Sequence, residues 1–389
     1  MGKQNYSREV LVVSQLVNST RGGILAPIMP FFIYELSNRS FFLLSLANNV
    51  SLLVTLVLSP VMGMLIDKTG RRKVFILFST CVGILLGFLT SFVDDYIQYI
   101  LINLAGAVVG VAGSLAFTSL MADVFDKKSR GKLLGLYNAV GLAGGILGNI
   151  LSAYVYQVVG VRGAIRIVSL TGLVTLLLYA SLKDDRRPIA RSSSITLIDS
   201  LKSFKDKGIL RLFALKAPLQ LPGILASGVF AIYFTEVLGG TPELWALLGA
   251  VNTAVGLTSI PYGYLVDRVG RKRMLYFSAV GWTILYLGYL FSRDPLTFSI
   301  FFVIPIWPAF NIAYTSMLFD ITEGENRTRL LGAMNSLNSI YTFIFSMLGG
   351  IIADLFEPRL VFLIALIPLS VSIPVIKLLA PDDAKTNVN

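Results

Sequence analysis

The residues with the clearest capacity for chemistry are polar side chains inside long apolar stretches. Arg21 lies well beyond Arg8, too deep in such a stretch for its side chain to reach water easily. A charge near the centre of a bilayer costs at least about 3 kcal/mol. We therefore expect Arg21 to bind an anionic group of a substrate or an internal carboxylate. The alternative is a structural arginine that donates to backbone carbonyls near Gly22 and Gly23.

Helical spacing groups further polar and aromatic residues. Steps of three or four residues place side chains on one face of a helix, so we expect these groups to line a substrate cavity. Hydrogen bonds that only hold helices together are the alternative for each asparagine. The predicted substrate-binding residues are Asn18, Arg21, Asn138, Gln220, Trp307, Asn311, Tyr314, Asn335, Asn338 and Tyr341.

Catalytic and metal-binding groups are scarce in this sequence. It contains no histidine and a single cysteine, Cys81, inside an apolar run, so His-based catalysis, zinc-ligand spacing and an intrachain disulfide are excluded. No GxxxxGK[ST] loop for nucleotide binding occurs either. We expect a protein that is not an enzyme, with no cofactor, no metal site and no ATP-driven step of its own.

A basic loop occurs twice. Residues 63–73 read Gly-Met-Leu-Ile-Asp-Lys-Thr-Gly-Arg-Arg-Lys, and residues 263–273 read Gly-Tyr-Leu-Val-Asp-Arg-Val-Gly-Arg-Lys-Arg. The first glycine permits close helix packing and the second permits a tight turn. Asp67 and Asp267, at the membrane boundary, can face a helix N-terminus or an arginine, where an anion is favoured.

A second repeated pair supports duplication of the whole chain. Asp123 precedes Arg130-Gly-Lys-Leu-Leu-Gly, and Asp320 precedes Arg327-Thr-Arg-Leu-Leu-Gly. The order of the repeated features is the same in both halves, which indicates two homologous halves. With an even number of spans each, the halves insert in the same sense.

The composition identifies the elements that hold these residues. Hydrophobic residues make up 55% of the chain and charged residues 14%, with a mean hydropathy of +0.74, which is typical of a membrane protein. We predict an all-α polytopic membrane protein with two pseudo-symmetric six-helix bundles, residues 1–182 and 209–389, joined by a cytoplasmic linker, 183–208. The twelve expected spans are 10–35, 41–66, 74–93, 97–122, 132–157, 164–182, 210–237, 244–266, 274–292, 296–320, 330–354 and 359–379.

The basic residues predict the orientation. The net charge of +11 and the pI near 9.6 come from short clusters between apolar runs, which argues against a nucleic-acid partner. Nearly all lysines and arginines fall in the tails and alternate loops, so the positive-inside rule places both termini in the cytoplasm of a multi-pass cell-membrane protein. The loops on the other side hold only Arg39, Arg162, Arg166, Arg293 and Arg359.

Four of the spans contain no Asn, Gln, Asp, Glu, Lys or Arg: 74–93, 167–182, 274–292 and 360–376. Polar groups are costly in hydrocarbon, so they should face protein or a water-filled path. We expect these four spans to face lipid and the other eight to surround a cavity.

The duplicated loop, placed between the second and third span of each half, resembles the signature of the major facilitator superfamily. This resemblance implies two cytoplasmic latches that hold one half against the other in an outward-open state. The alternative is that the loop arginines only anchor the topology. The first predicted latch comprises Gly63, Asp67, Gly70, Arg71, Asp123 and Arg130, and the second Gly263, Asp267, Gly270, Arg271, Asp320 and Arg327.

The resemblance also implies a mode of action. Arg21 followed by Pro27 and Pro30 is similar to the first helix of the drug-efflux branches, whereas the Gly-Pro pair of efflux antiporters is absent from 132–160. We expect an alternating-access secondary transporter of a small organic solute, with efflux favoured and proton coupling left open. Its partners would be the solute, protons and membrane lipids, and it would act as a monomer. The alternatives are an uptake symporter or uniporter for a sugar or organic anion, and a channel or non-transporting receptor.

Overall fold

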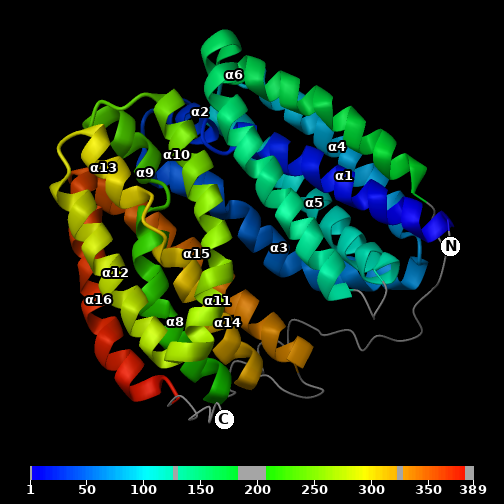
Figure 1. The fold of residues 1–389 in the computed structure, drawn as a ribbon. Helices are drawn as coiled ribbons and strands as arrows, with labels where there is room; N and C mark the ends of the chain where they lie inside the picture. Colours follow the sequence, from blue (N-terminus) through cyan, green and yellow to red (C-terminus); the bar gives the residue numbers. More distant parts are fainter. Residues whose placement is uncertain (1, 126–129, 183–206, 322–326, 382–389) are drawn as a thin grey trace. The chain divides into compact units, whose positions relative to one another are not determined.

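The computed structural model describes residues 2–125, 130–182, 207–321 and 327–381, which form helices and turns and no β-strand (Figure 1). Nothing further is described for the rest of the chain, which includes most of the predicted linker. In the first half, the helices are α1 (Gly2–Leu25), α2 (Met29–Leu36), α3 (Phe41–Thr69), α4 (Arg72–Thr90), α5 (Tyr96–Val124) and α6 (Arg130–Ser181).

The second half repeats this order with more interruptions. Its elements are α8 (Lys207–Ala226), α9 (Phe230–Ile232), η1 (Tyr233–Val237), α10 (Pro242–Val255), η2 (Gly256–Thr258), α11 (Ser259–Val269), α12 (Arg271–Phe291), α13 (Pro295–Phe302), α14 (Ile306–Ile321), α15 (Arg327–Leu355) and α16 (Pro358–Leu379).

The predicted all-α architecture of twelve spans is confirmed. Ten helices in the described part of the chain are long and apolar enough to cross a membrane. One of these, α6, contains two spans, because Gly160 adopts a φ of 65° and reverses the chain between them. The remaining span is formed by α1 and α2 together. We call the end of the helices near Gly70 and Gly270 the basic end, and the end near Gly160 the far end.

The prolines divide some spans and not others. The first span is interrupted at 26–28, beside Pro27, and α13 is separated from α14 at 303–305, where Pro305 lies. Both interruptions follow from the chemistry of proline, which removes a backbone donor and disfavours a helical residue before it. In contrast, α8 continues through Pro218 and Pro222 to Ala226.

The helices pack as two compact units. The described part of unit 1 comprises residues 2–39, 50–125, 130–182 and 242–253, and that of unit 2 comprises 40–49, 207–241, 254–321 and 327–381. The units follow the two repeats, except that the first residues of α3 pack in unit 2 and most of α10 packs in unit 1. The predicted bundle limits, 1–182 and 209–389, stay a prediction from the sequence.

Glycines bring α1 and α6 into close backbone contact in unit 1. A Cβ on Gly148 would lie 2.2 Å from the carbonyl oxygen of Thr20, and a Cβ on Gly144 would lie 2.7 Å from that of Leu16. No side chain fits at either position, so these glycines serve helix packing, as small residues do between membrane helices.

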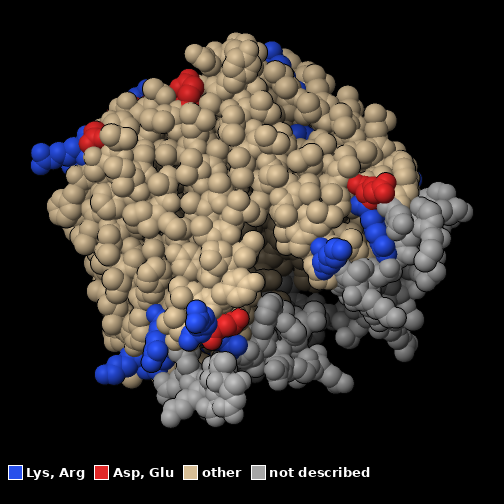
Figure 2. Space-filling view, in the orientation of Figure 1, with Lys and Arg blue, Asp and Glu red and all other residues tan. Residues whose placement is uncertain are grey.

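The four spans without amide or charged residues expose apolar side chains. On α4, for example, Val74, Phe78 and Leu85 are all more than half exposed, as expected for a surface covered by lipid. In the view of Figure 2, helix flanks carry almost no charged side chains, which lie near the helix ends instead.

Aspartates and arginines fix the turns at the far end of each unit. Asp95 accepts hydrogen bonds from the backbone of Ile97 and Gln98 at the start of α5, and Asp294 caps α13 in the same way. Hydrogen bonds from the side chain and backbone of Thr297 lower the pKa of Asp294. Arg162 donates to the carbonyl of Val93 at 3.0 Å. These contacts explain why basic residues occur at an end where the charge pattern predicts few.

Candidate functional site

The repeated basic loop forms a tight turn in both units. Gly70 and Gly270 have φ values of 61° and 99°, which only glycine adopts readily, and the next helix starts directly afterwards. By contrast, Gly63 and Gly263 lie inside helices, with no atom within 4 Å of the position where a Cβ would be. The turn glycines are therefore required by the backbone conformation.

The ion pair beside the first loop joins Arg72 to Asp123. The Arg72 side chain is only 6% exposed, whereas the Asp123 side chain is 58% exposed. Of the residues predicted to form the first latch, Asp67 and Arg71 make no side-chain hydrogen bond or ion pair with any described residue. The structure thus brings Asp123 to the second arginine of the loop.

The counterpart in unit 2 is less completely described. Asp267 is exposed and has no hydrogen bond or ion pair within the described ranges, whereas Arg271 has an interaction. The structure does not describe the side chains of three predicted latch residues, namely Arg130, Asp320 and Arg327.

Asn18 and Arg21 lie together on α1 and face the second span of α6. The Nε of Arg21 donates to the carbonyl of Val168 at 2.9 Å, and its Nη1 donates to Oδ1 of Asn18 at 3.3 Å. The same Asn18 oxygen accepts from Thr175 at 3.1 Å, while its amide donates to the Tyr179 hydroxyl at 2.9 Å. The carbonyl bound by Arg21 is thus on another span, not beside Gly22 and Gly23.

A hollow of about 420 Å³ adjoins this network inside unit 1, and we call it the arginine hollow. Helices α1, α4, α5 and α6 all contribute to its wall. The expectation that spans 74–93 and 167–182 face lipid and leave the cavities to other spans is therefore wrong, because each of them also has a face inside unit 1. Gly172, on α6, leaves the space that the arginine occupies, because a Cβ there would lie 2.7 Å from Nη2 of Arg21. The polar residues that line the arginine hollow are Asn18, Arg21, Ser79, Thr80, Ser114, Tyr137, Thr175 and Tyr179.

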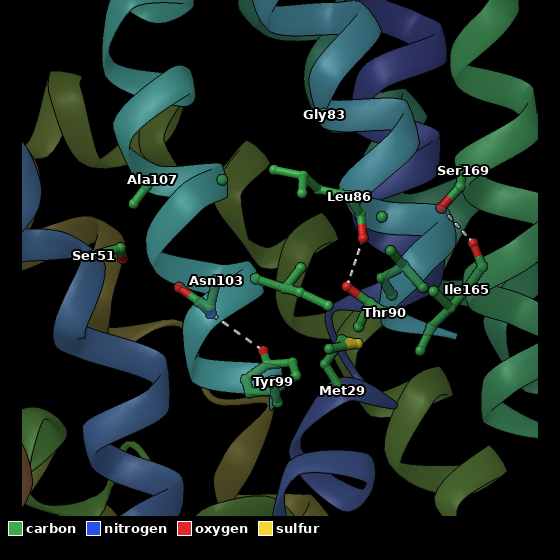
Figure 3. Close-up of a pocket in the computed structure, with 14 residues that line it drawn as sticks. Met29, Ser51, Gly83, Leu86, Thr90, Tyr99, Asn103, Ala107, Ile165 and Ser169 are labelled. Atoms are coloured by element: carbon green, nitrogen blue, oxygen red, sulfur yellow. Dashed lines mark hydrogen bonds between the residues drawn. The ribbon is translucent and has the colours of Figure 1, made fainter. Parts of the chain in front are cut away.

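A second hollow of unit 1, of about 330 Å³, lies between α4, α5 and α6 nearer the far end, and we call it the far hollow. Figure 3 shows Met29, Leu86 and Ile165 pointing into it. The amide of Asn103 is engaged with the Tyr99 hydroxyl at 3.3 Å. The lining is mainly apolar, and Gly83 borders both this hollow and the arginine hollow.

Unit 2 contains a hollow of about 390 Å³ that we call the aromatic hollow. Three predicted substrate-binding residues line it: Gln220 on α8, and Trp307 and Asn311 on α14. Its other walls include aromatic rings, and the Trp282 ring lies 4.9 Å from that of Phe310. Amide groups among aromatic rings suit recognition of a polar or aromatic organic solute.

The other predicted residues do not line these hollows. Tyr314 is buried, stacks on Phe310 at 5.7 Å and faces the Lys216 ammonium at 5.2 Å. Tyr341 donates from its hydroxyl to the carbonyl of Ala217 at 2.9 Å. The remaining three, Asn138, Asn335 and Asn338, make no side-chain hydrogen bond with a described residue.

One contact that the sequence did not indicate joins α3 to α15 within unit 2. The carboxylate of Asp354 accepts hydrogen bonds from the backbone N–H groups of Phe41 and Phe42 and from Ser40 Oγ. The only sequence signal is an aspartate near a span end, which does not identify a partner more than 300 residues away.

Comparisons with known proteins agree with this fold. The sequence profile of the Major Facilitator Superfamily matches residues 11–235 and 212–389, so the chain belongs to this superfamily. The chain is 26% identical over 287 residues to the multi-drug resistance efflux pump PmrA of Streptococcus pneumoniae serotype 4, covering 72% of this chain and 71% of that protein. It is 21% identical over 379 residues to the multidrug resistance protein MdtG of Escherichia fergusonii, covering 92% and 91%.

Solved structures show the same fold at low sequence identity. The nucleoside transporter NupG superposes with a TM-score of 0.76 and 12% identity, over 95% of this chain and 99% of that one. A bacterial homologue of the human lysosomal transporter Spinster gives a TM-score of 0.72 and 14% identity, over 96% of both chains. The chain is therefore a membrane transporter of the superfamily.

Proposed function

We propose that this chain exports a small organic solute by alternating access, with both termini in the cytoplasm. The observation that carries the proposal is the pair of polar sites among apolar spans, the arginine hollow in unit 1 and the aromatic hollow in unit 2. Groups that are costly in hydrocarbon occur where a solute can contact them. Export is supported by PmrA and MdtG, which are named as a multidrug efflux pump and a multidrug resistance protein.

The proposed substrate-binding groups are the ten predicted residues, of which five line hollows. Asn18 and Arg21 serve the first site, and Gln220, Trp307 and Asn311 the second. The two basic loops, with Asp67 and Asp267, form latches at the basic end that close when the transporter opens outward. In this proposal the carrier is a monomer in contact with membrane lipid, and size-exclusion chromatography with light scattering tests that state.

Protons are the proposed coupling ion. Carboxylates of the described part lie near the span ends, as Asp67 and Asp123 do at the basic end and Asp354 does at the far end. In this proposal the protons bind carboxylates near the span ends, because no Asp or Glu lines the three hollows of the described residues. Proton binding at the span ends differs from proton binding by a carboxylate that also contacts the substrate.

Export is tested with purified protein in liposomes of known orientation. Saturable accumulation of a fluorescent organic dye, driven by an imposed pH gradient and stimulated by counterflow, is expected. A rate that rises linearly with dye concentration would instead indicate a channel, and binding without any flux would indicate a receptor. Either result overturns the proposal.

A further inference from the structure

The guanidinium of Arg21 has donors that no described residue of the chain accepts. Its Nε and Nη1 make the bonds to Val168 and Asn18, whereas neither N–H of Nη2 has an acceptor among the described residues. No carboxylate in that part of the chain pairs with it. A membrane-embedded cation without a counter-ion favours an anionic ligand, because charges inside a membrane are stable when paired.

The surroundings of Arg21 suit the head of such a ligand. The arginine hollow gives access to the guanidinium and holds further hydroxyl groups. The hydroxyl of Tyr137 has no hydrogen-bond partner among the described residues and lines the same hollow. An arginine fork and a hydroxyl donor are the groups that bind carboxylate or phosphate oxygens with defined geometry.

The far hollow suits an apolar chain attached to that head. Leu25 and Met29, one and two turns beyond Arg21 on the first span, line it together with Ile165. Gly83 borders both hollows, and a Cβ there would meet nothing within 4 Å, so the hollows adjoin at this residue. An elongated molecule can therefore place one end at the arginine and the other among apolar groups.

We propose that unit 1 holds a binding site for an organic anion with an apolar chain, with the anionic head on Arg21 and the chain in the far hollow. The proposal names a substrate class for the first site and rests on the proposed function only for the transport step. The competing role of Arg21 is a tether between α1 and α6 through Val168. A tether alone gives no preference for anionic ligands.

Binding to the purified full-length protein in nanodiscs of neutral lipid separates these roles. Dodecanoate, dodecanol and dodecyltrimethylammonium carry the same chain with an anionic, neutral or cationic head. Dodecanoate is expected to bind at least about tenfold more tightly than the other two, which corresponds to roughly 1.4 kcal/mol. Equal binding of the three compounds would overturn the site.

Two glycine variants test the position of the arginine without removing its charge. In Gly172→Ala, the new methyl group would lie 2.7 Å from both Nη2 of Arg21 and Cγ1 of Ile84. The guanidinium and the Ile84 side chain must therefore both shift, and the preference for dodecanoate should fall. Gly135→Ala is the control on the same helix, since Gly135 lines none of the three hollows and a Cβ there meets nothing within 4 Å. Equal anion preference in both variants contradicts the proposal.

The variant Arg21→Gln should remove the preference, whereas Arg21→Lys should keep part of it. If Arg21→Gln does not fold, the glycine pair still decides the question. Lysophosphatidylglycerol, used in place of dodecanoate, shows whether the anion comes from membrane lipid or from solution, and tight binding of either supports the site. Loss of dye export with dodecanoate binding intact would reject the proposed function and leave this site standing.

Discussion

Asp354 caps the first turn of α3 at Phe41. Its Oδ1 accepts the backbone N–H of Phe41 at 2.7 Å, and its Oδ2 accepts that of Phe42 at 2.9 Å. The helix approaches closely because Gly350, one turn earlier on α15, has no side chain; a Cβ there would lie 2.6 Å from the carbonyl oxygen of Phe41. An aspartate from one repeat therefore accepts hydrogen bonds from the backbone N–H groups at the start of a helix from the other.

Replacing this carboxylate should destabilise the protein. Asp354→Ala leaves the donors of Phe41 and Phe42 without their acceptor, and loss of a helix cap costs about 1 kcal/mol. We expect a lower unfolding temperature in detergent. Glu357→Ala is the control, because Glu357 stands before α16 without making a side-chain cap hydrogen bond. Equal unfolding temperatures for the two variants would contradict the capping role.

The two loop arginines Arg71 and Arg72 should differ in their effect on stability. Arg72→Gln removes a buried charge partner of Asp123, and we expect a loss of about 1 to 2 kcal/mol. This is less than the roughly 3 to 5 kcal/mol of a fully buried pair, because the carboxylate is largely exposed. Arg71→Gln should leave the unfolding temperature unchanged. The reverse order would show that Arg71 is the partner of Asp123.

Asp67→Asn tests the proposed latch through transport instead. Asp67 makes no side-chain hydrogen bond or ion pair within the described ranges, so the substitution should change stability by less than about 0.5 kcal/mol. If the carboxylate meets a helix end when the transporter opens outward, its loss shifts that equilibrium by roughly two- to fivefold. Initial rates in proteoliposomes measure the change. Wild-type rates at equal insertion would rule out the latch.

The contact between α1 and α6 predicts a strong effect of a single methyl group. Gly148→Ala places a Cβ 2.2 Å from the carbonyl oxygen of Thr20, and overpacking of this kind costs typically about 1 to 3 kcal/mol. Gly135→Ala, on the same helix, meets nothing within 4 Å and should be neutral or slightly stabilising. Thermal unfolding of both variants tests this difference, and a tolerated Gly148→Ala would contradict the close packing.

Hydropathy and the internal repeat were sufficient to predict the spans, because membrane insertion imposes a length and a composition on every helix. Pro27 and Pro305 also marked real interruptions, since proline acts locally on its own backbone. Pro218 and Pro222 did not end α8, which continues to Ala226.

Contacts between residues far apart in the sequence were harder to predict from the sequence. The sequence placed Asp123 near the basic loop, yet which of two adjacent arginines meets it depends on the rotation of α4, which no local pattern determines. Similarly, the depth of Arg21 was readable from its position, whereas its direction toward Val168 depends on how α1 and α6 cross. The cap on α3 depends on two segments that share no motif.

The hydrogen bonds of Asp354 can form only late in the synthesis of the chain. The chain separating Phe41 from Asp354 is 313 residues long, and synthesis proceeds at about 5 to 20 residues per second. Asp354 is therefore synthesised roughly 15 to 60 s after the start of α3. During that interval the N–H groups of Phe41 and Phe42 have to donate to another acceptor, from water, lipid head groups or the insertion machinery.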